Sequence, residues 1–577
     1  MRALPAALLA FALPASAQIQ DTGTFTYLLD RPWTSMDPAR TAEASDFLLA
    51  GNVYEPLLAF LGERQSEVFL PLLAEDIPSH ENGLLSEDRL VAAFPVRKGV
   101  RLHGGSELSA EDVRYSFLRA MIYADEGSAA SILLGLLAGR PDSPDPRVLP
   151  ASELKAAFDA VEARKGALVL RFKRPVPLLL KLIASMPVMT SKDWALAQGD
   201  WDGSEADWYA RLAERPAKSP LDARMNGTGP YRLEKADSGD ALLARHEGYW
   251  RKPAALRRAA LRVVPSAGER ILRLEAADAD AADMEDAFAR RAKGYPGIRW
   301  AESPPLGRLG KLVLFNLRVS SASPFVGSGV LDGKGLPADL FAERAVRQAF
   351  SFLFDYERYH REALGSSGRR TDGPFPPALL ETAARPRWKK DLARAAALLK
   401  GVRGGALWRK GFVLPIAFDA GSPAELVAAR VLQAGLESLG PQFRARLHPM
   451  ERERLRRELD ARTLPLAVAD FSAEIPDLAA FAYPLLHSGG RLARRQGYSS
   501  PGLDALIDEA ASSEDPKARR RAWAKVLRRA QEDVPQIWTY SPAEFEACRA
   551  GVKGCGNEEN VAGLGFLGLP YFYAYSE

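Results

Sequence analysis

The chain has 577 residues, of which 47% are hydrophobic and 26% are charged, a balance that is ordinary for a globular protein with an ample core. Its length predicts two or more domains. The formal net charge of +4 is too small to indicate a nucleic-acid-binding protein, so we interpret the Arg-rich runs at 491–495 and 517–521 as solvated helix faces.

The first 17 residues have the composition of an export signal. Arg2 precedes an apolar run at 4–13, and Ala-Ser-Ala at 15–17 supplies the small residues that a signal peptidase requires. The run is too short to span a bilayer, which takes ~20 apolar residues. Because no Cys stands near the cut, we predict cleavage before Gln18 and a periplasmic protein that is not a lipoprotein.

Apolar patterns predict strands and helices in alternation along the rest of the chain. Ser109 is placed to cap a helix whose first turn carries Glu111 and Asp112. The mostly apolar strand at 311–317 is typical of a sheet covered on both faces. Strands are expected at 24–29, 90–96, 311–317, 443–448, 464–469 and 537–540, and helices at 47–58, 110–121, 343–364, 424–439, 503–511 and 518–532. This alternation predicts an α/β fold.

The most distinctive local pattern is Asn-Gly-Thr-Gly-Pro-Tyr-Arg-Leu at 226–233. The two glycines allow a sharp turn, and the following Pro fixes the backbone where a strand begins. Glu-Gly-Tyr-Trp at 247–250 follows about one hairpin later. The Trp- and Ala-rich stretch at 191–220 is expected to be an ordered insertion, and the pattern at 226–233 is expected to serve structure rather than binding.

In this order, the segments resemble the periplasmic solute-binding proteins of the dipeptide, oligopeptide and nickel class (bacterial extracellular solute-binding protein family 5), which feed ABC importers. Each matching segment is a weak signal alone, but together they follow the family's order across nearly all of the mature chain. The matching segments are at 36–38, 52–57, 96–103, 111–113, 227–231, 249–250, 315–316, 346–350 and 497–501. The chain departs from the family at 104–107, at 277–280 and at 466–469, where the usual Trp is absent.

The resemblance implies two lobes joined by two crossing strands that act as a hinge. Lobe one, with an extra subdomain, would comprise 18–264 and return at 536–577, and lobe two would comprise 265–535. The crossings are expected at Leu261–Val264 and near Ile537. Such a protein closes on its ligand, here expected to be a di- to oligopeptide, and delivers it to the permease subunits of the importer. It is expected to be a monomer without a cofactor, a metal or catalytic activity.

Asp470 is the main candidate for the ligand site. A binder without sequence preference must hold the parts that all peptides share, including the terminal ammonium. A carboxylate at the end of the strand 464–469 is costly to bury unless a cation arrives, and family members place an acid there. The alternatives are that Asp470 caps the next segment or pairs with a nearby Arg, and that Asp477 is the ligand acid instead.

Four further residues are candidates for the walls of the site. The resemblance implies that the segment 41–45 forms one edge, from which Glu43 and Ser45 could reach the ligand; the start of a surface helix is the alternative that the sequence favours. Phe471 and Tyr483 offer aromatic surfaces, for which core packing is the alternative.

Cys548 and Cys555 are the only two cysteines, with six residues between them. In an exported chain this spacing predicts one small disulfide that closes a surface loop. Half of a metal site is the alternative, but the sequence shows no further ligands nearby.

Other functions are alternatives to solute binding. A secreted serine hydrolase would carry Gly-x-Ser-x-Gly, and the nearest strings, at 327–329 and 365–368, lack that spacing. The six His are scattered, which argues against zinc and, within the binding class, against a nickel chelate. Haem, an opine or an oligosaccharide remain alternative cargoes, and a sensor without transport remains an alternative role.

Overall fold

The computed structural model describes residues 23–41, 44–60, 68–125, 127–140, 147, 149–187, 189–214, 216–237, 239–284, 288–289, 294–303, 308–380, 386–473 and 475–553. The predicted signal segment at 1–17, the candidate Glu43 and the candidate Cys555 lie outside these residues. Within them, every helix is too short or too polar to cross a lipid bilayer.

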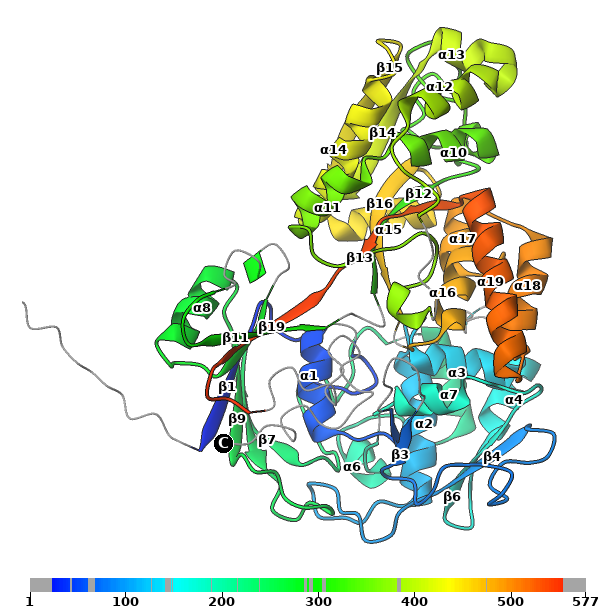
Figure 1. Ribbon diagram of the computed structural model, residues 1–577. Helices are drawn as coiled ribbons and strands as arrows, with labels where there is room; N and C mark the ends of the chain where they lie inside the picture. Colours follow the sequence, from blue (N-terminus) through cyan, green and yellow to red (C-terminus); the bar gives the residue numbers. More distant parts are fainter. Residues whose placement is uncertain are drawn as a thin grey trace, which may run out of the picture.

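The chain folds into two bodies, one above the other in Figure 1, each built around a β-sheet with helices packed against it. The first body contains the seven-stranded sheet and the second body contains the five-stranded sheet. This architecture confirms the predicted two-lobed α/β fold.

The sheet of the first body has the order β11-β19-β10-β1-β9-β8-β7. Its central strand β1 pairs in parallel with β9 and with β10, and five of its six residues are buried. The last strand of the described residues, β19, runs antiparallel between β10 and β11, so a segment far along the chain joins the sheet that contains β1. The strands are β1 (Thr24–Leu29), β7 (Tyr231–Asp237), β8 (Asp240–Arg245), β9 (Arg258–Val263), β10 (Ala281–Met284), β11 (Ile298–Ser303) and β19 (Glu544–Arg549).

A second core fills the rest of the first body. The segment 191–220 belongs to this core, because Trp201 and Trp208 are fully buried in it. The sheets here are β2-β3 and β4-β6-β5. The elements are β2 (Leu58–Phe60), β3 (Phe69–Pro71), β4 (Val91–Pro95), β5 (Val161–Arg164), β6 (Ala167–Arg171), α2 (Ala110–Tyr123), α3 (Ala129–Ala138), α4 (Ala151–Asp159), α5 (Leu179–Ala184), α6 (Lys192–Ala197) and α7 (Glu205–Glu214), while α1 (Ala44–Val53) and α8 (Ala267–Glu275) lie beside the larger sheet.

The sheet of the second body has the order β15-β14-β16-β12-β17. The predicted single helix at 343–364 is two helices, because Asp355 caps a new start by accepting a hydrogen bond from the Arg358 N–H at 3.0 Å. The elements are β12 (Arg308–Phe315), β13 (Arg369–Arg370), β14 (Phe412–Asp419), β15 (Phe443–Met450), β16 (Leu466–Ser472), β17 (Gln536–Trp538), β18 (Tyr540–Ser541), α10 (Arg344–Leu353), α11 (Tyr356–Leu364), α12 (Leu392–Gly401), α13 (Ala406–Lys410), α14 (Pro423–Glu437), α15 (Arg452–Asp460), α16 (Leu478–Leu486), α17 (Arg491–Gln496), α18 (Pro501–Ser512) and α19 (Pro516–Asp533).

The observed strand pairing disagrees with both predicted positions at which the chain crosses between the bodies. The segment Leu261–Val264 lies beside β1 inside the first sheet, and β10 and β11 still belong to that sheet. Pro265 does not end a lobe, because it precedes Ser266, whose side chain caps α8. β12, which begins at Arg308, belongs to the second sheet, and Ile537 pairs with β12 there, so Ile537 lies inside the second sheet rather than at a crossing.

The distinctive turn at 226–233 locks two of the sequence motifs together. A Cβ on Gly227 would lie 2.0 Å from the carbonyl oxygen of Val53, so only glycine allows this approach. The Glu55 carboxylate, two residues on, accepts hydrogen bonds from the Tyr249 hydroxyl at 2.6 Å and from the Trp250 indole at 2.9 Å. These motifs therefore form the internal structure of the first body, as the sequence predicted for the turn.

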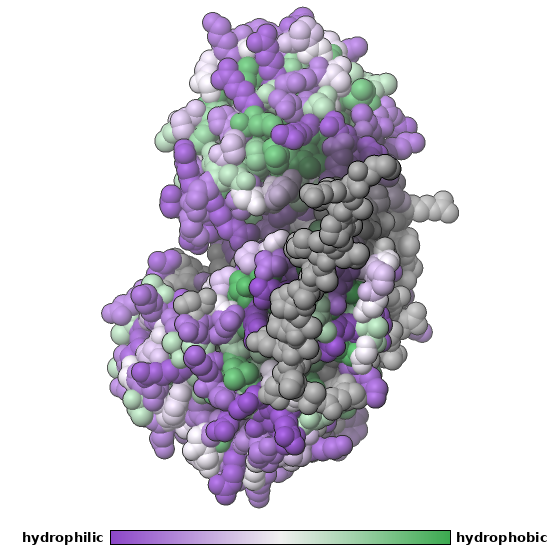
Figure 2. Space-filling view, turned by 90° about the vertical axis from the view of Figure 1, so that its left-hand side faces the viewer, coloured by the Kyte–Doolittle hydropathy of each residue, from purple (hydrophilic) through white to green (hydrophobic). Residues whose placement is uncertain are grey.

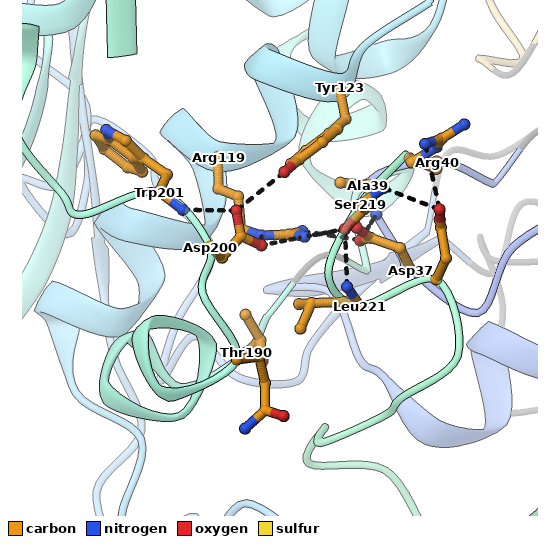
Figure 3. A network of polar contacts seen from close by, with 12 residues as sticks. Asp37, Ala39, Arg40, Arg119, Tyr123, Thr190, Asp200, Trp201, Ser219 and Leu221 are labelled. Carbon is orange, nitrogen blue, oxygen red and sulfur yellow. Dashed lines mark hydrogen bonds and ion pairs between the residues drawn. The ribbon is translucent and has the colours of Figure 1, made fainter. Parts of the chain in front are cut away.

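A buried ion network anchors the Met-Asp-Pro segment at 36–38 to α2 (Figure 3). The Arg119 guanidinium donates to both oxygens of Asp37, at 2.8 and 2.5 Å, and to Asp200 at 2.7 Å. The Ser219 hydroxyl accepts a further bond at 3.0 Å, and the Tyr123 hydroxyl donates to Asp200 at 3.0 Å. Burial raises the pKa of Asp37, but the charge of Arg119 together with hydrogen bonds from Arg119, Ser219 and the Ala39 N–H outweighs burial and lowers the pKa overall.

Candidate ligand-binding site

Asp470 forms a charged pair with Lys311 on the neighbouring strand. Lys311 in β12 stands directly opposite Asp470 in β16, and its Nζ lies 3.2 Å from the carboxylate Oδ2. The Asp470 side chain is 50% exposed, whereas that of Lys311 is 15% exposed. The carboxylate of Asp470 is thus open to solvent, and the ammonium of Lys311 is more buried. This pairing matches the alternative that Asp470 pairs with a basic residue of the protein, although that residue is Lys rather than the expected Arg.

Glu425 is a third member of this cluster that the sequence analysis missed. Its Oε1 accepts a hydrogen bond from Lys311 Nζ at 3.0 Å, and its Oε2 accepts one from the backbone N–H of Asp419 at 2.8 Å. Glu425 is 2% exposed in the first turn of α14, where the Ser422 hydroxyl caps the helix. The Ser-x-x-Glu spacing before the predicted helix was the signal that could have located it.

Burial and neighbouring charges set the ionisation of both acids. Burial raises the pKa of Asp470, but the charge of Lys311 and its hydrogen bond, with Arg452 and Arg308, outweigh burial and lower it overall. For Glu425 burial dominates, so its pKa is raised even though Lys311 and the Asp419 N–H stabilise the charged form. Asp470 is therefore the ionised, accessible acid of the cluster.

Two aromatic candidates lie in the hydrophobic core rather than on the wall of a site. Phe471 is 6% exposed and packs edge-on against Phe481, on the face of β16 opposite Asp470. Tyr483 in α16 is 9% exposed, and its hydroxyl donates to Asp508. Core packing, the alternative given for both residues, is what the structure shows.

The remaining candidates do not join Asp470. Ser45 is buried in α1, and its hydroxyl donates to the Pro32 carbonyl at 3.2 Å. Glu43 lies outside the described residues, as does Cys555, the predicted partner of Cys548, which itself is disulfide-bonded. Among the contacts of the described residues, none connects Asp470 with Ser45 or Tyr483, so of the described candidates only Asp470 is kept in the proposed ligand site.

Asp477, the fallback candidate, lies between the two bodies. It caps α16, and its carboxylate accepts hydrogen bonds from Arg519 at 2.9 and 2.8 Å and from Lys181 at 3.2 Å. Lys181 belongs to α5 of the first body. Because Asp477 is 5% exposed and already paired with two cations, it serves contact between the bodies rather than a ligand.

The Asp470–Lys311 pair suits reversible binding of a polar group. Asp470 offers acceptor oxygens, and Lys311 offers an ammonium donor beside them. Lys311 is three residues from Arg308, the first residue of β12, which at ~3.3 Å per residue places the pair about 10 Å from the start of that strand. On the face shown in Figure 2, hydrophilic side chains border the notch between the upper and lower bodies. The described residues contain no cluster of His, Cys, Asp and Glu suited to a metal ion.

Most of the chain is similar to known proteins. Residues 69–492 match the family model described as bacterial extracellular solute-binding proteins, family 5 Middle. The chain is 24% identical to Di/tripeptide-binding protein 2 of Pseudomonas aeruginosa, over 95% of this chain and 94% of that protein. It is 21% identical to Heme-binding protein A of Haemophilus influenzae, over 93% of this chain and 90% of that protein.

A solved structure shares the fold across almost the whole chain. The periplasmic binding protein DppA of Helicobacter pylori, associated with an ABC transporter and bound to the peptide STSA, has a TM-score of 0.69 and 20% identity. The similarity covers 96% of this chain and 98% of that one, so the two-body architecture is common to both.

Proposed function

The chain belongs to family 5 of the bacterial extracellular solute-binding proteins, and from this premise we propose that it is the periplasmic subunit of an ABC importer that captures di- to oligopeptides. It would bind them between its two bodies, close around them and deliver them to permease subunits in the inner membrane. We propose further that it acts as a monomer, after removal of the predicted signal segment at 1–17.

The limits of the two lobes follow the sheets. We propose that lobe one comprises the mature chain up to Ser303 together with the segment from Glu544 onward, and that lobe two comprises Arg308–Ser541. The two crossings then lie between these segments, where a few residues would absorb the change of backbone angles on closure. A ligand that shifts a mostly open population to a mostly closed one must favour the closed form by ~5.5 kcal/mol.

The observation that carries the proposed site is the half-exposed, ionised carboxylate of Asp470, which lies about 10 Å along β12 from the proposed crossing. Here it can accept hydrogen bonds from the amino-terminal N–H groups of a peptide, which every peptide presents. The di/tripeptide-binding relative and the peptide-bound structure of the same fold support peptide as the cargo.

Replacing Asp470 tests the site. We expect Asp470→Ala to weaken binding of di- to pentapeptides at least about tenfold in calorimetry, since a hydrogen bond to a charged group is worth ~1.5–3 kcal/mol. The variant should keep its fold, because Lys311 retains Glu425 as a partner. Circular dichroism and the melting temperature check this point.

Asp460→Ala is a matched control. Asp460 is 49% exposed and pairs with Arg495, which is 15% exposed, so its environment is close to that of the Asp470–Lys311 pair. Peptide affinity should be unchanged in this control. Equal affinity of wild type and Asp470→Ala would refute the site, and binding of haem or another solute instead of peptides would refute the cargo.

A further inference from the structure

We propose that Lys311 is a built-in competitor for the cationic end of the ligand at Asp470, and that it shifts the preference of the site toward ligands whose end there is uncharged. This inference rests on the proposed function, because it concerns the same site and a peptide ligand. It names the chemical class that the site favours, namely peptides with a blocked or otherwise neutral amino terminus.

Contacts of both the side chain and the backbone fix the position of Lys311. The strand register places it opposite Asp470, and its Nζ lies 3.2 Å from Asp470 Oδ2 and 3.0 Å from Glu425 Oε1. The Thr539 hydroxyl donates to the Lys311 backbone carbonyl at 2.6 Å, which ties this point of β12 to the returning chain. The ammonium therefore cannot move far from Asp470 without also leaving Glu425.

The charges around Asp470 are already balanced. Asp470, Glu425 and Asp419 are the acids of the cluster. Lys311 pairs with two of them, Arg452 pairs with Asp419 at 3.3 Å, and Arg308 stands near Asp470 on the same strand as Lys311. Among the contacts of the described residues, three cations thus face three acids, so an incoming ammonium meets no excess of negative charge there.

A charged ammonium and a neutral amide would interact with Asp470 and Lys311 with different energies. A free amino terminus would place a second positive charge on a carboxylate that Lys311 already neutralises, so like-charge repulsion offsets the new hydrogen bonds. The N–H of a blocked amino terminus donates to Asp470 without that repulsion. Lys311 therefore favours the neutral end, while Asp470 remains the acceptor for both.

Competition between two peptide pools measures the effect. The probes are alanine di- to pentapeptides with free amino termini and the same peptides N-acetylated, mixed in equal amounts, with the bound ratio read by native mass spectrometry. For Lys311→Met we expect the ratio to shift at least about tenfold toward the free peptides. Lys311→Arg, which keeps the charge, should retain the wild-type ratio, and Arg495→Met, a cation of equal exposure on another acid, should not change it.

A second variant keeps the test valid if Lys311→Met does not fold. Because Lys311→Met leaves the Glu425 carboxylate buried without its cation, the double variant Lys311→Met/Glu425→Gln removes both charges and should show the same shift. An unchanged ratio in both variants, with either pool bound, overturns the role of Lys311 alone. If neither pool binds to wild type or to the variants, the proposed peptide function falls, and this inference with it.

Discussion

Arg119 is the centre of a buried polar network in the interior of the first body. It is 1% exposed and joins Asp37 and Asp200, which come from distant parts of the chain. A buried guanidinium is costly unless every donor is used, and here the partners are carboxylates and a hydroxyl in good geometry. The network holds the segment that leads to α1 in place against α2.

We expect Arg119→Met to lower the free energy of unfolding by ~3–5 kcal/mol, since it leaves two buried carboxylates without their cation. Urea unfolding followed by circular dichroism measures this. Arg273→Met is the control, because its pair with Glu269 is exposed and such pairs contribute ~0.5 kcal/mol or less. Similar losses in the two variants would contradict the importance of the buried network.

At the scale of single residues, the sequence suggested Asp470 as a candidate but did not predict its neighbours Lys311 and Glu425. An acid after an apolar strand is visible in the sequence, and the family resemblance gave it a role. Lys311 lies 159 residues earlier, and only the register of β12 against β16 brings the two together. For the same reason Phe471 was predicted as a wall: its hydrophobicity is readable, but the face of the strand that it occupies depends on the register.

β12 and β18, the strands of the second body next to the proposed crossings, are bound to each other where they run side by side. The Ser541 hydroxyl donates to the Arg308 carbonyl at 2.8 Å, and a bulge follows at Gly310. Gly310 has φ +75°, and a Cβ there would lie 2.1 Å from the Tyr540 carbonyl oxygen. Only glycine satisfies both the backbone angle and this close approach.

Gly310→Ala should therefore destabilise the protein more than Gly99→Ala. Gly99 has the same φ of +75° but nothing within 4 Å of a built Cβ, so its replacement costs only the ~1–2 kcal/mol of a left-handed backbone. Gly310→Ala adds the displacement of the Tyr540 backbone, and weaker peptide binding should accompany the loss of stability. Equal melting temperatures of the two variants would contradict the close approach of Gly310 to the Tyr540 backbone.

At the level of elements, local patterns predicted strands and helices well but not their partners. The strand at 464–469 and the helix capped by Ser109 were confirmed, because alternation, apolar runs and caps are local signals. The crossings were misplaced, since no local signal tells whether β10 and β11 pair with β1 and β19 or with a second sheet.

In the whole molecule, the two bodies meet through the ion cluster around Asp477. Lys181 of the first body and Arg519 of the second share its carboxylate, and Ile475 nearby is fully buried in the core of the first body. Burial raises the pKa of Asp477, but Lys181 and Arg519 overcome this effect and lower it. This contact stabilises the arrangement in which the bodies touch.

We expect Asp477→Asn to separate the bodies without unfolding them. Asn keeps the cap of α16 but removes the charge that Lys181 and Arg519 share, so the radius of gyration from small-angle scattering should rise in the absence of peptide. Glu514→Gln is the control, because its pair with Arg89 also links the bodies but is about 40% exposed on both sides. Identical scattering of wild type and Asp477→Asn would contradict the role of this contact.

The most direct test of the central claim is native mass spectrometry of the protein isolated from the periplasm without denaturation. If a solute is held at Asp470 between the two bodies, wild type should carry bound masses of short peptides, and Asp470→Ala should carry little or none. Retention of the same peptides by Asp470→Ala, or a bound solute that is not a peptide, would contradict the account.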